Sequence, residues 1–161
     1  MSTGATILQH DSMARLTVEG CQGAGCWIHD VTYHQPIDFV VALINASAWC
    51  RQFIQYECFG SALWRKGGNH IGWAVSRDNE RLTNWGGVDT GTEGCQCQFT
   101  GDCPGLKCNC DANDEVWRSD EGFLTDSTNL PVIRLQFGDA NGQGYATLGA
   151  LECYGLAKND S

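Results

Sequence analysis

The sequence predicts an α+β fold in which β-structure dominates, held together by disulfides and rich in loops. Three observations predict it: 10 cysteines among 161 residues, 20 glycines spread along the chain, and apolar segments of period two with only one of helical period. A chain of this length can bury a core of its own. We therefore expect a single disulfide-rich domain over residues 1–161.

The first half of the chain supplies edge strands, the main helix and one further strand. Ala5–Val18 alternates weakly and predicts one or two edge strands. Pro36–Ala48 predicts a helix with proline in its first turn, because apolar residues recur there at intervals of three and four. Phe53–Tyr56, between two cysteines, is strand-like.

The second half predicts three more strand regions among long loops. Ile71–Ser76 and Leu82–Trp85 surround a turn-forming tetrad and predict a hairpin. The glycine-rich stretch Gly86–Gly94 predicts a loop that leads into a cluster of cysteines. Two strands, Leu130–Phe137 and Tyr145–Tyr154, are expected near the end.

The charge of the chain excludes several classes of partner. Nineteen acidic residues against 10 Lys plus Arg give a net charge of −9 and a pI of about 4.7. Phosphate binding needs clustered basic residues, and the ten here are scattered, so neither nucleic acid nor an anionic membrane surface is an expected partner. No apolar run is long enough for a spanning helix, so no membrane insertion is expected.

The cysteines predict an oxidised framework of up to five bridges in an extracellular protein. Five of them lie in Cys95–Cys110, and their spacing does not fit the paired ligands of a structural zinc site. Within each C-x-C of this segment the two side chains share a face of an extended chain, so each should pair elsewhere. Spacing leaves the pairing open, including whether Cys26 closes a ring with Cys21 or joins two chains.

Catalytic motifs are missing from the sequence. It has no nucleophile elbow, no H-E-x-x-H zinc motif and no phosphate-binding glycine loop. The four histidines sit in unrelated settings, and bridged cysteines cannot act as nucleophiles. We therefore expect a binding protein and no enzyme.

An acidic run after the cysteine cluster predicts a calcium site. Asp111, Asn113 and Asp114 place carboxylate and amide oxygens close together, and calcium prefers six to eight such oxygens. The run is not an EF-hand, because Val116 stands where that loop needs glycine and Gly122 where it needs glutamate. The alternative is a solvated acidic turn.

The six tryptophans suggest a carbohydrate site. Trp85 and Trp117 lie next to loops and polar residues, and flat rings of this kind pack on the C–H faces of sugars. The alternative is that each tryptophan belongs to the core, most clearly Trp73 in the middle of its strand. The residues expected to contact sugar are Asn84, Trp85, Asp89, Trp117 and Asp120. Two N-glycosylation sequons, at Asn45 and Asn159, complete the motifs.

Ordered motifs along nearly the whole chain carry a family resemblance. They include Asp30-Val31-Thr32-Tyr33-His34-Gln35, Trp49-Cys50, Asn84-Trp85-Gly86-Gly87, Cys95-Gln96-Cys97 and Cys108-Asn109-Cys110-Asp111-Ala112. The chain resembles the fibrinogen-like module of contactin-associated, neurexin IV type adhesion proteins. The resemblance implies a secreted, non-enzymatic fold with a twisted antiparallel sheet, related to fibrinogen C-terminal domains and fibrillar collagen C-propeptides.

The same resemblance supplies two functional readings. In ficolins and tachylectins of the wider group, a calcium loop lies beside a pocket for acetylated sugars, and Asp111 and Asn113 match the start of such a loop. No laminin-like or EGF-like neighbour stands within the 161 residues, which favours a secreted, extracellular lectin that binds glycans, with N-acetylated sugars as candidates. One shallow site binds weakly, so we expect a homo-oligomer. The alternative is an adhesion module that binds a protein partner.

Overall fold

The largest element of the structure is a five-stranded antiparallel sheet. A computed structural model describes residues 4–139 and 143–156. The strand order is β1-β10-β4-β8, and β2 also pairs with β10. The strands are β1 (Ala5–Leu8), β2 (Leu16–Val18), β4 (Ser47–Phe59), β8 (Arg118–Leu124) and β10 (Gln143–Leu156).

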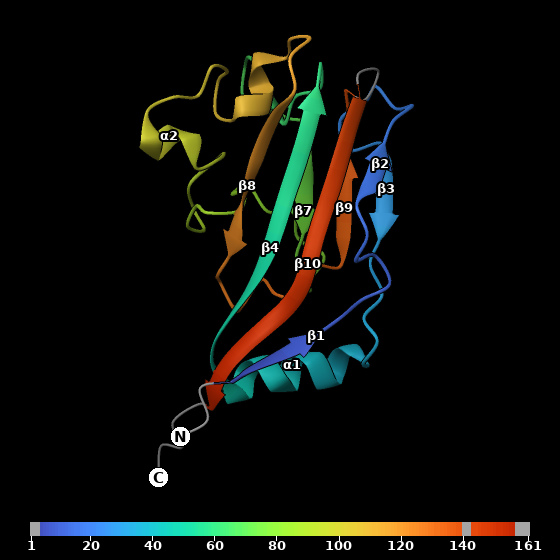
Figure 1. Ribbon diagram of the computed structural model, residues 1–161, viewed down its shortest axis with the longest axis vertical. Helices are drawn as coiled ribbons and strands as arrows, with labels where there is room; N and C mark the ends of the chain where they lie inside the picture. Colours follow the sequence, from blue (N-terminus) through green and yellow to red (C-terminus); the bar gives the residue numbers. More distant parts are fainter. Residues whose placement is uncertain (1–3, 140–142, 157–161) are drawn as a thin grey trace.

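A second, smaller sheet lies behind the first. It has the order β3-β9-β7. The strands β5 and β6, which come just before β7 in the sequence, form a separate two-stranded hairpin. These strands are β3 (Trp27–Asp30), β5 (Trp64–Arg65), β6 (Asn69–His70), β7 (Trp73–Val75) and β9 (Arg134–Phe137). Figure 1 shows β4 and β10 side by side along the long axis, with β7 and β9 behind them.

One main helix closes an end of the molecule. α1 (Ile37–Ala46) buries Val40 and Ile44, and Pro36 takes the N-cap position just outside the first turn. Two short helices, α2 (Cys97–Thr100) and the 3-10 helix η1 (Asn109–Ala112), lie in the cysteine-rich segment. No helix in the described ranges has the length and apolar character needed to cross a bilayer.

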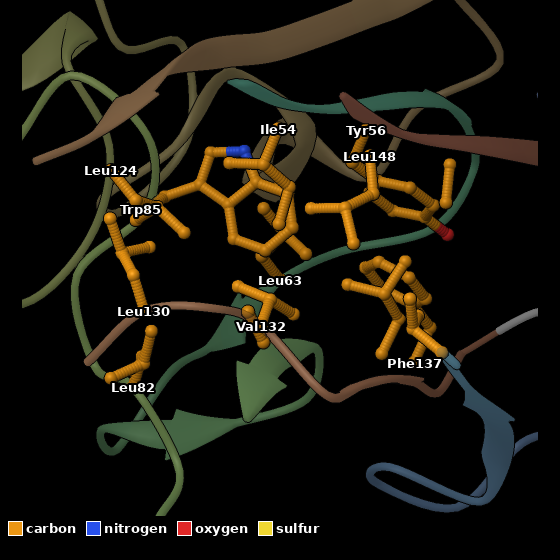
Figure 2. Close-up of a cluster of buried hydrophobic side chains, with 14 of the residues drawn as sticks. Ile54, Tyr56, Leu63, Leu82, Trp85, Leu124, Leu130, Val132, Phe137 and Leu148 are labelled. Carbon is orange, nitrogen blue, oxygen red and sulfur yellow. The ribbon is translucent and has the colours of Figure 1, made fainter. Parts of the chain in front are cut away.

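The core fills the space between the two sheets. The inner side of β4 contributes Ile54 and Tyr56, both with exposures of 1% or less. Tyr56 stacks on Phe137 of β9 with ring centroids 4.3 Å apart, so an aromatic pair joins the two layers. Figure 2 shows these residues together with Trp85 and Leu148 in one cluster.

All ten cysteines are paired, which confirms the predicted framework of five bridges. The pairs are Cys21–Cys26, Cys50–Cys153, Cys58–Cys110, Cys95–Cys108 and Cys97–Cys103. The members of each C-x-C pair elsewhere, as predicted from their shared face. Cys21 and Cys26 close a ring with each other, so Cys26 joins no second chain. No cysteine thiol is left to bind zinc.

The α+β fold class is confirmed, with several corrections to its elements. The strand predicted at Phe53–Tyr56 is the centre of a 13-residue strand. The predicted hairpin partner Leu82–Trp85 is no regular strand; Arg81, just before it, forms an isolated bridge with Val75, and Asn84 within it forms another with Gly94. The strands β3 and β8 were not predicted, because neither has a run of apolar residues.

The disulfide Cys58–Cys110, which joins β4 to the cysteine-rich segment, should stabilise the protein more than the local disulfide Cys97–Cys103. Cys58–Cys110 closes a separation of 52 residues and Cys97–Cys103 one of 6. Chain-entropy arguments give losses of about 4 and about 2 kcal/mol for the two double Cys→Ala variants. Denaturant unfolding measures the difference, and equal losses would contradict the longer-range role of Cys58–Cys110.

Candidate functional site

Asp111, the first predicted calcium ligand, joins two segments of the protein. Its Oδ1 accepts hydrogen bonds from the backbone N–H groups of Leu63 (3.0 Å) and Trp64 (2.7 Å). Its Oδ2 accepts from those of Lys107 (3.0 Å) and Cys108 (2.9 Å). Burial raises the pKa of Asp111, and these four donors oppose the rise. The carboxylate therefore fixes the β5 region onto the cysteine-rich segment.

The other two predicted calcium ligands are also engaged within the protein. Asp114 forms a bidentate pair with Arg118, with Nε–Oδ1 and Nη2–Oδ2 distances of 2.9 and 2.7 Å. This pair lowers the pKa of Asp114. When the Asn113 amide is oriented to satisfy its hydrogen bonds, its nitrogen donates to Gly60 O and to Asp139 Oδ2 at 3.1 Å each. The three predicted ligands thus point to separate partners.

One group of three ligand-type residues does converge within the described ranges. Cys95, Cys108 and Asp120 have ligand atoms within 4.8 Å of one another. The two sulfurs are bonded to each other, however, and a disulfide is not a metal-binding thiolate pair. Calcium binding stays a prediction, and the contacts of these side chains do not favour it.

Three of the five predicted sugar contacts are internal. Trp85 is 4% exposed, and its Nε1 donates to the backbone oxygen of Asp120 (2.9 Å). The buried Asn84 donates to Val88 O (3.0 Å). The buried carboxylate of Asp120 accepts the backbone N–H groups of Asn109 and Cys110, both at 2.9 Å. These side chains hold loops together and present no group to solvent in this structure.

Burial also gives Asp120 an unusual acidity. Its pKa rises to about 6, because desolvation outweighs the two backbone donors.

Trp73 is 5% exposed, which confirms that it belongs to the core. The structure thus favours the core alternative for Trp73 and Trp85 alike, since polar neighbours in sequence did not place Trp85 at the surface.

Asp89 and Trp117 are the predicted sugar contacts that reach solvent. Asp89 lines a cavity of about 360 Å³ with Gln96 and Thr125. Trp117 is 47% exposed. It comes just before β8 in the chain and stacks on Tyr145 of β10. With Trp85 buried, Trp117 is the predicted stacking ring that reaches solvent, and it does not line the cavity that contains Asp89.

A larger cavity lies between the β5–β6 hairpin and the cysteine-rich segment. It measures about 570 Å³ and is lined by Arg65, Lys66 and Asn69 from the hairpin side and by Leu106 and Asp111 opposite. Arg65 is already paired with a carboxylate, that of Asp139, at 2.6 Å. This cavity is near the cysteine cluster, where a pocket was predicted, but its lining includes none of the five predicted sugar contacts.

The outer side of the five-stranded sheet is a broader candidate. Residues of β4 alternate between buried and half-buried, so one side of the strand faces the core and the other faces outward. In Figure 1, no helix or strand of the described chain lies in front of the middle of β4 and β10. The outward residues from Arg51 onward are Arg51, Phe53, Gln55, Glu57 and Phe59.

Aromatic side chains from three strands meet on this side. Phe53 of β4 is in register with Phe123 of β8, with ring centroids 5.6 Å apart in an edge arrangement. Trp49 of β4 stacks on Tyr154 of β10 at 4.1 Å and keeps 48% exposure. These pairs lie toward the end of the sheet where α1 packs.

The other end of the sheet repeats the arrangement. Trp117 stacks on Tyr145 at 5.6 Å and lies 5.4 Å from Phe59. The guanidinium of Arg15 lies 3.9 Å from the centre of the Tyr145 ring and 3.6 Å from the carboxylate of Glu57. We call the seven aromatic residues the outer aromatic face: Trp49, Phe53, Phe59, Trp117, Phe123, Tyr145 and Tyr154.

Two arginines lie on the outer aromatic face, and each is paired with a carboxylate. Arg51 lies 4.0 Å from the centre of the Phe123 ring and 3.3 Å from Glu152. Tryptophan, tyrosine and arginine are the residues that contribute most often to protein–protein hot spots. An aromatic surface with paired charges is therefore suited to bind another protein. The alternation of β4 was visible in the sequence, but the sequence did not show which side lacked a cover.

The pKa of Asp120 predicts a pH dependence of stability. A carboxyl whose pKa in the folded protein, about 6, exceeds its ordinary value of 3.8 stabilises the fold fully at pH below 3.8, and this contribution is lost as pH rises through 6. The loss is on the order of 3 kcal/mol. His70, whose pKa falls to about 4, acts in the opposite direction. The measurement is therefore the difference between wild type and Asp120→Asn.

We expect the wild type to lose stability relative to Asp120→Asn as pH rises from about 4 to 7, because asparagine does not ionise. Denaturant unfolding at a series of pH values measures this difference. Parallel pH profiles of the two proteins would contradict the assignment.

Calcium should leave thermal stability unchanged. A ligand that binds only the folded state raises the melting temperature, but the oxygens of Asp111 and Asp114 are already used by backbone and arginine donors. Calorimetry in millimolar calcium and in EDTA compares the two states. A calcium-dependent rise that Asp114→Asn abolishes would contradict this expectation.

Comparisons with known proteins agree with the family resemblance. No protein-family model matches the sequence. The chain is 33% identical over 157 residues to contactin-associated protein 1 of Homo sapiens and of Rattus norvegicus; the match spans 93% of this chain and 11% of each relative. It is also 33% identical over 162 residues to neurexin-4 of Drosophila melanogaster, spanning 93% of this chain and 13% of that protein.

The chain thus spans between a tenth and a seventh of the length of these relatives. Over nearly its whole length the chain is therefore similar to one segment of the contactin-associated, neurexin IV type proteins, as its motifs predicted.

Proposed function

We propose that this chain is an extracellular adhesion-type module that binds another protein through the outer aromatic face. The observation that carries the proposal is that face itself: aromatic and arginine side chains on the uncovered side of the central sheet. The relatives support a protein partner, since one of them is named for its association with contactin.

The five disulfides support an extracellular location. Such a framework forms and persists in oxidising compartments and outside cells. Because no catalytic constellation was predicted, the proposed role is binding alone. The lectin reading gains no support from the relatives, and the residues expected to hold the sugar do not meet in one pocket.

The outer aromatic face has the physical properties of a preorganised surface. The stacked pairs hold Trp49 and Trp117 in fixed orientations while leaving each of them about half exposed. Side chains that are already ordered lose little conformational entropy when a partner binds. The half-exposed rings can then be desolvated in the complex, which is where hot-spot energy arises.

Substitutions on the outer aromatic face should weaken binding to a contactin ectodomain, the first partner to test. Trp49→Ala and Trp117→Ala should each lower affinity by a factor of about 30, the effect of a hot spot of about 2 kcal/mol. Ile28→Ala and Phe99→Ala are matched controls, since both residues are exposed and apolar but lie on β3 and α2. Calorimetric unfolding checks that each variant folds, and surface plasmon resonance measures binding.

Two results would contradict the proposal. Wild-type affinity in both tryptophan variants, with loss in Lys66→Glu, would move the interface to the cavity beside the β5–β6 hairpin. Loss of binding after enzymatic removal of glycans from the contactin ectodomain would favour the lectin reading instead.

A further inference from the structure

The C-terminal turn of α1 carries a glycosylation sequon that the proposed function does not use. The motif is Asn45-Ala46-Ser47, an asparagine followed by a residue other than proline and then by serine. Asn45 and Ala46 are both exposed. Among residues 4–139 and 143–156, the Asn45 side chain makes no hydrogen bond. The second sequon, at Asn159, lies outside the described residues.

The surface of α1 next to Asn45 is apolar. With 3.6 residues per turn, Phe39, Ala42 and Ala46 lie along the exposed side of the helix, and Asn45 lies beside them. Phe39 is 52% exposed, and the only charged residue of the helix is Asp38. Exposed apolar helix surface is unfavourable in water and promotes association. An oligosaccharide on Asn45 would cover this stripe.

The disulfides indicate that the chain folds in a compartment where N-linked glycosylation takes place. Five disulfides indicate that the chain folds where thiols are oxidised, and in animal cells this is also where N-linked oligosaccharides are added. Transfer acts on an unfolded segment, so the helix around Asn45 in the folded protein does not prevent it. What the folded protein must provide is room for the product, and the exposure of Asn45 provides it.

We propose that Asn45 carries an N-linked oligosaccharide that shields the apolar side of α1. The donor is an oligosaccharide on a lipid pyrophosphate. The Asn45 side-chain nitrogen forms a bond to the anomeric carbon of the N-acetylglucosamine that is attached to the pyrophosphate, and it releases one proton to solvent. The bond from that carbon to the pyrophosphate oxygen breaks, and the lipid pyrophosphate leaves with the bonding electrons.

The test uses protein secreted from animal cells in an Asn159→Gln background, so that any oligosaccharide reports on Asn45. Peptide mapping by mass spectrometry should find an N-acetylglucosamine-linked glycan on the peptide containing Asn45. Asn45→Gln and Ser47→Ala should remove it, and Ser47→Thr should retain it. Ser47→Ala also removes the hydrogen bond that Ser47 Oγ donates to Leu43 O (2.7 Å), and Asn45→Gln is the control because it removes the sequon and leaves that hydrogen bond in place.

Shielding is tested separately from attachment. The Asn45→Gln protein should self-associate more than the glycosylated one in light scattering, and Phe39→Ser in the same background should reverse the change. An unmodified Asn45 in the secreted protein would overturn the proposal. A glycan whose removal leaves self-association unchanged would overturn its shielding role.

Discussion

The alternation of β4 between buried and outward residues from Cys50 onward is the constraint on which the rest of the structure depends. β4 is paired on both sides, with β10 and with β8, so neither of its edges is free. Successive side chains of a strand point to opposite sides of a sheet. One set, including Ile54 and Tyr56, forms the core, and the other set forms the outer aromatic face. The same periodicity thus gives the chain its stability and its proposed binding surface.

Two carboxylates, the buried Asp120 and the half-buried Asp111, and one disulfide attach the cysteine-rich segment to this sheet. Cys58 at the end of β4 is bonded to Cys110, and Asp120 of β8 accepts the backbone N–H of the same residue. Asp111 then holds the β5 region from the other side. A buried carboxylate keeps its place when donors satisfy it. Both carboxylates therefore contribute to the structure as hydrogen-bond acceptors, and calcium binding at the acidic run stays a prediction.

The sequence predicted the fold class and the helix well, because both depend on local periodicity. It predicted the bridges as a set, but their pairing required the three-dimensional arrangement, since Cys58 and Cys110 are 52 residues apart. β8 was missed because it reads Arg-Ser-Asp-Glu-Gly-Phe-Leu, and its central place next to β4 is decided by pairing. Tertiary context often overrides local preference in strands.

The candidate site was harder to predict for a related reason. Polar neighbours in sequence suggested that Trp85 faces solvent, yet its ring lies in the core beside Phe137. Trp117 was correctly placed near the surface, but its neighbours Phe59 and Tyr145 come from strands far apart in the chain. A surface made by three strands has no contiguous motif, so it becomes visible only when register is known.

The six tryptophans provide the most direct test, because each indole N–H gives its own NMR signal. Trp49 and Trp117 lie on the outer aromatic face, whereas Trp64, Trp73 and Trp85 are buried. When the contactin ectodomain is added to labelled protein, the indole signals of Trp49 and Trp117 should shift or broaden more than the buried three. A change confined to Trp64, which lines the cavity beside the β5–β6 hairpin, would contradict binding at the outer aromatic face.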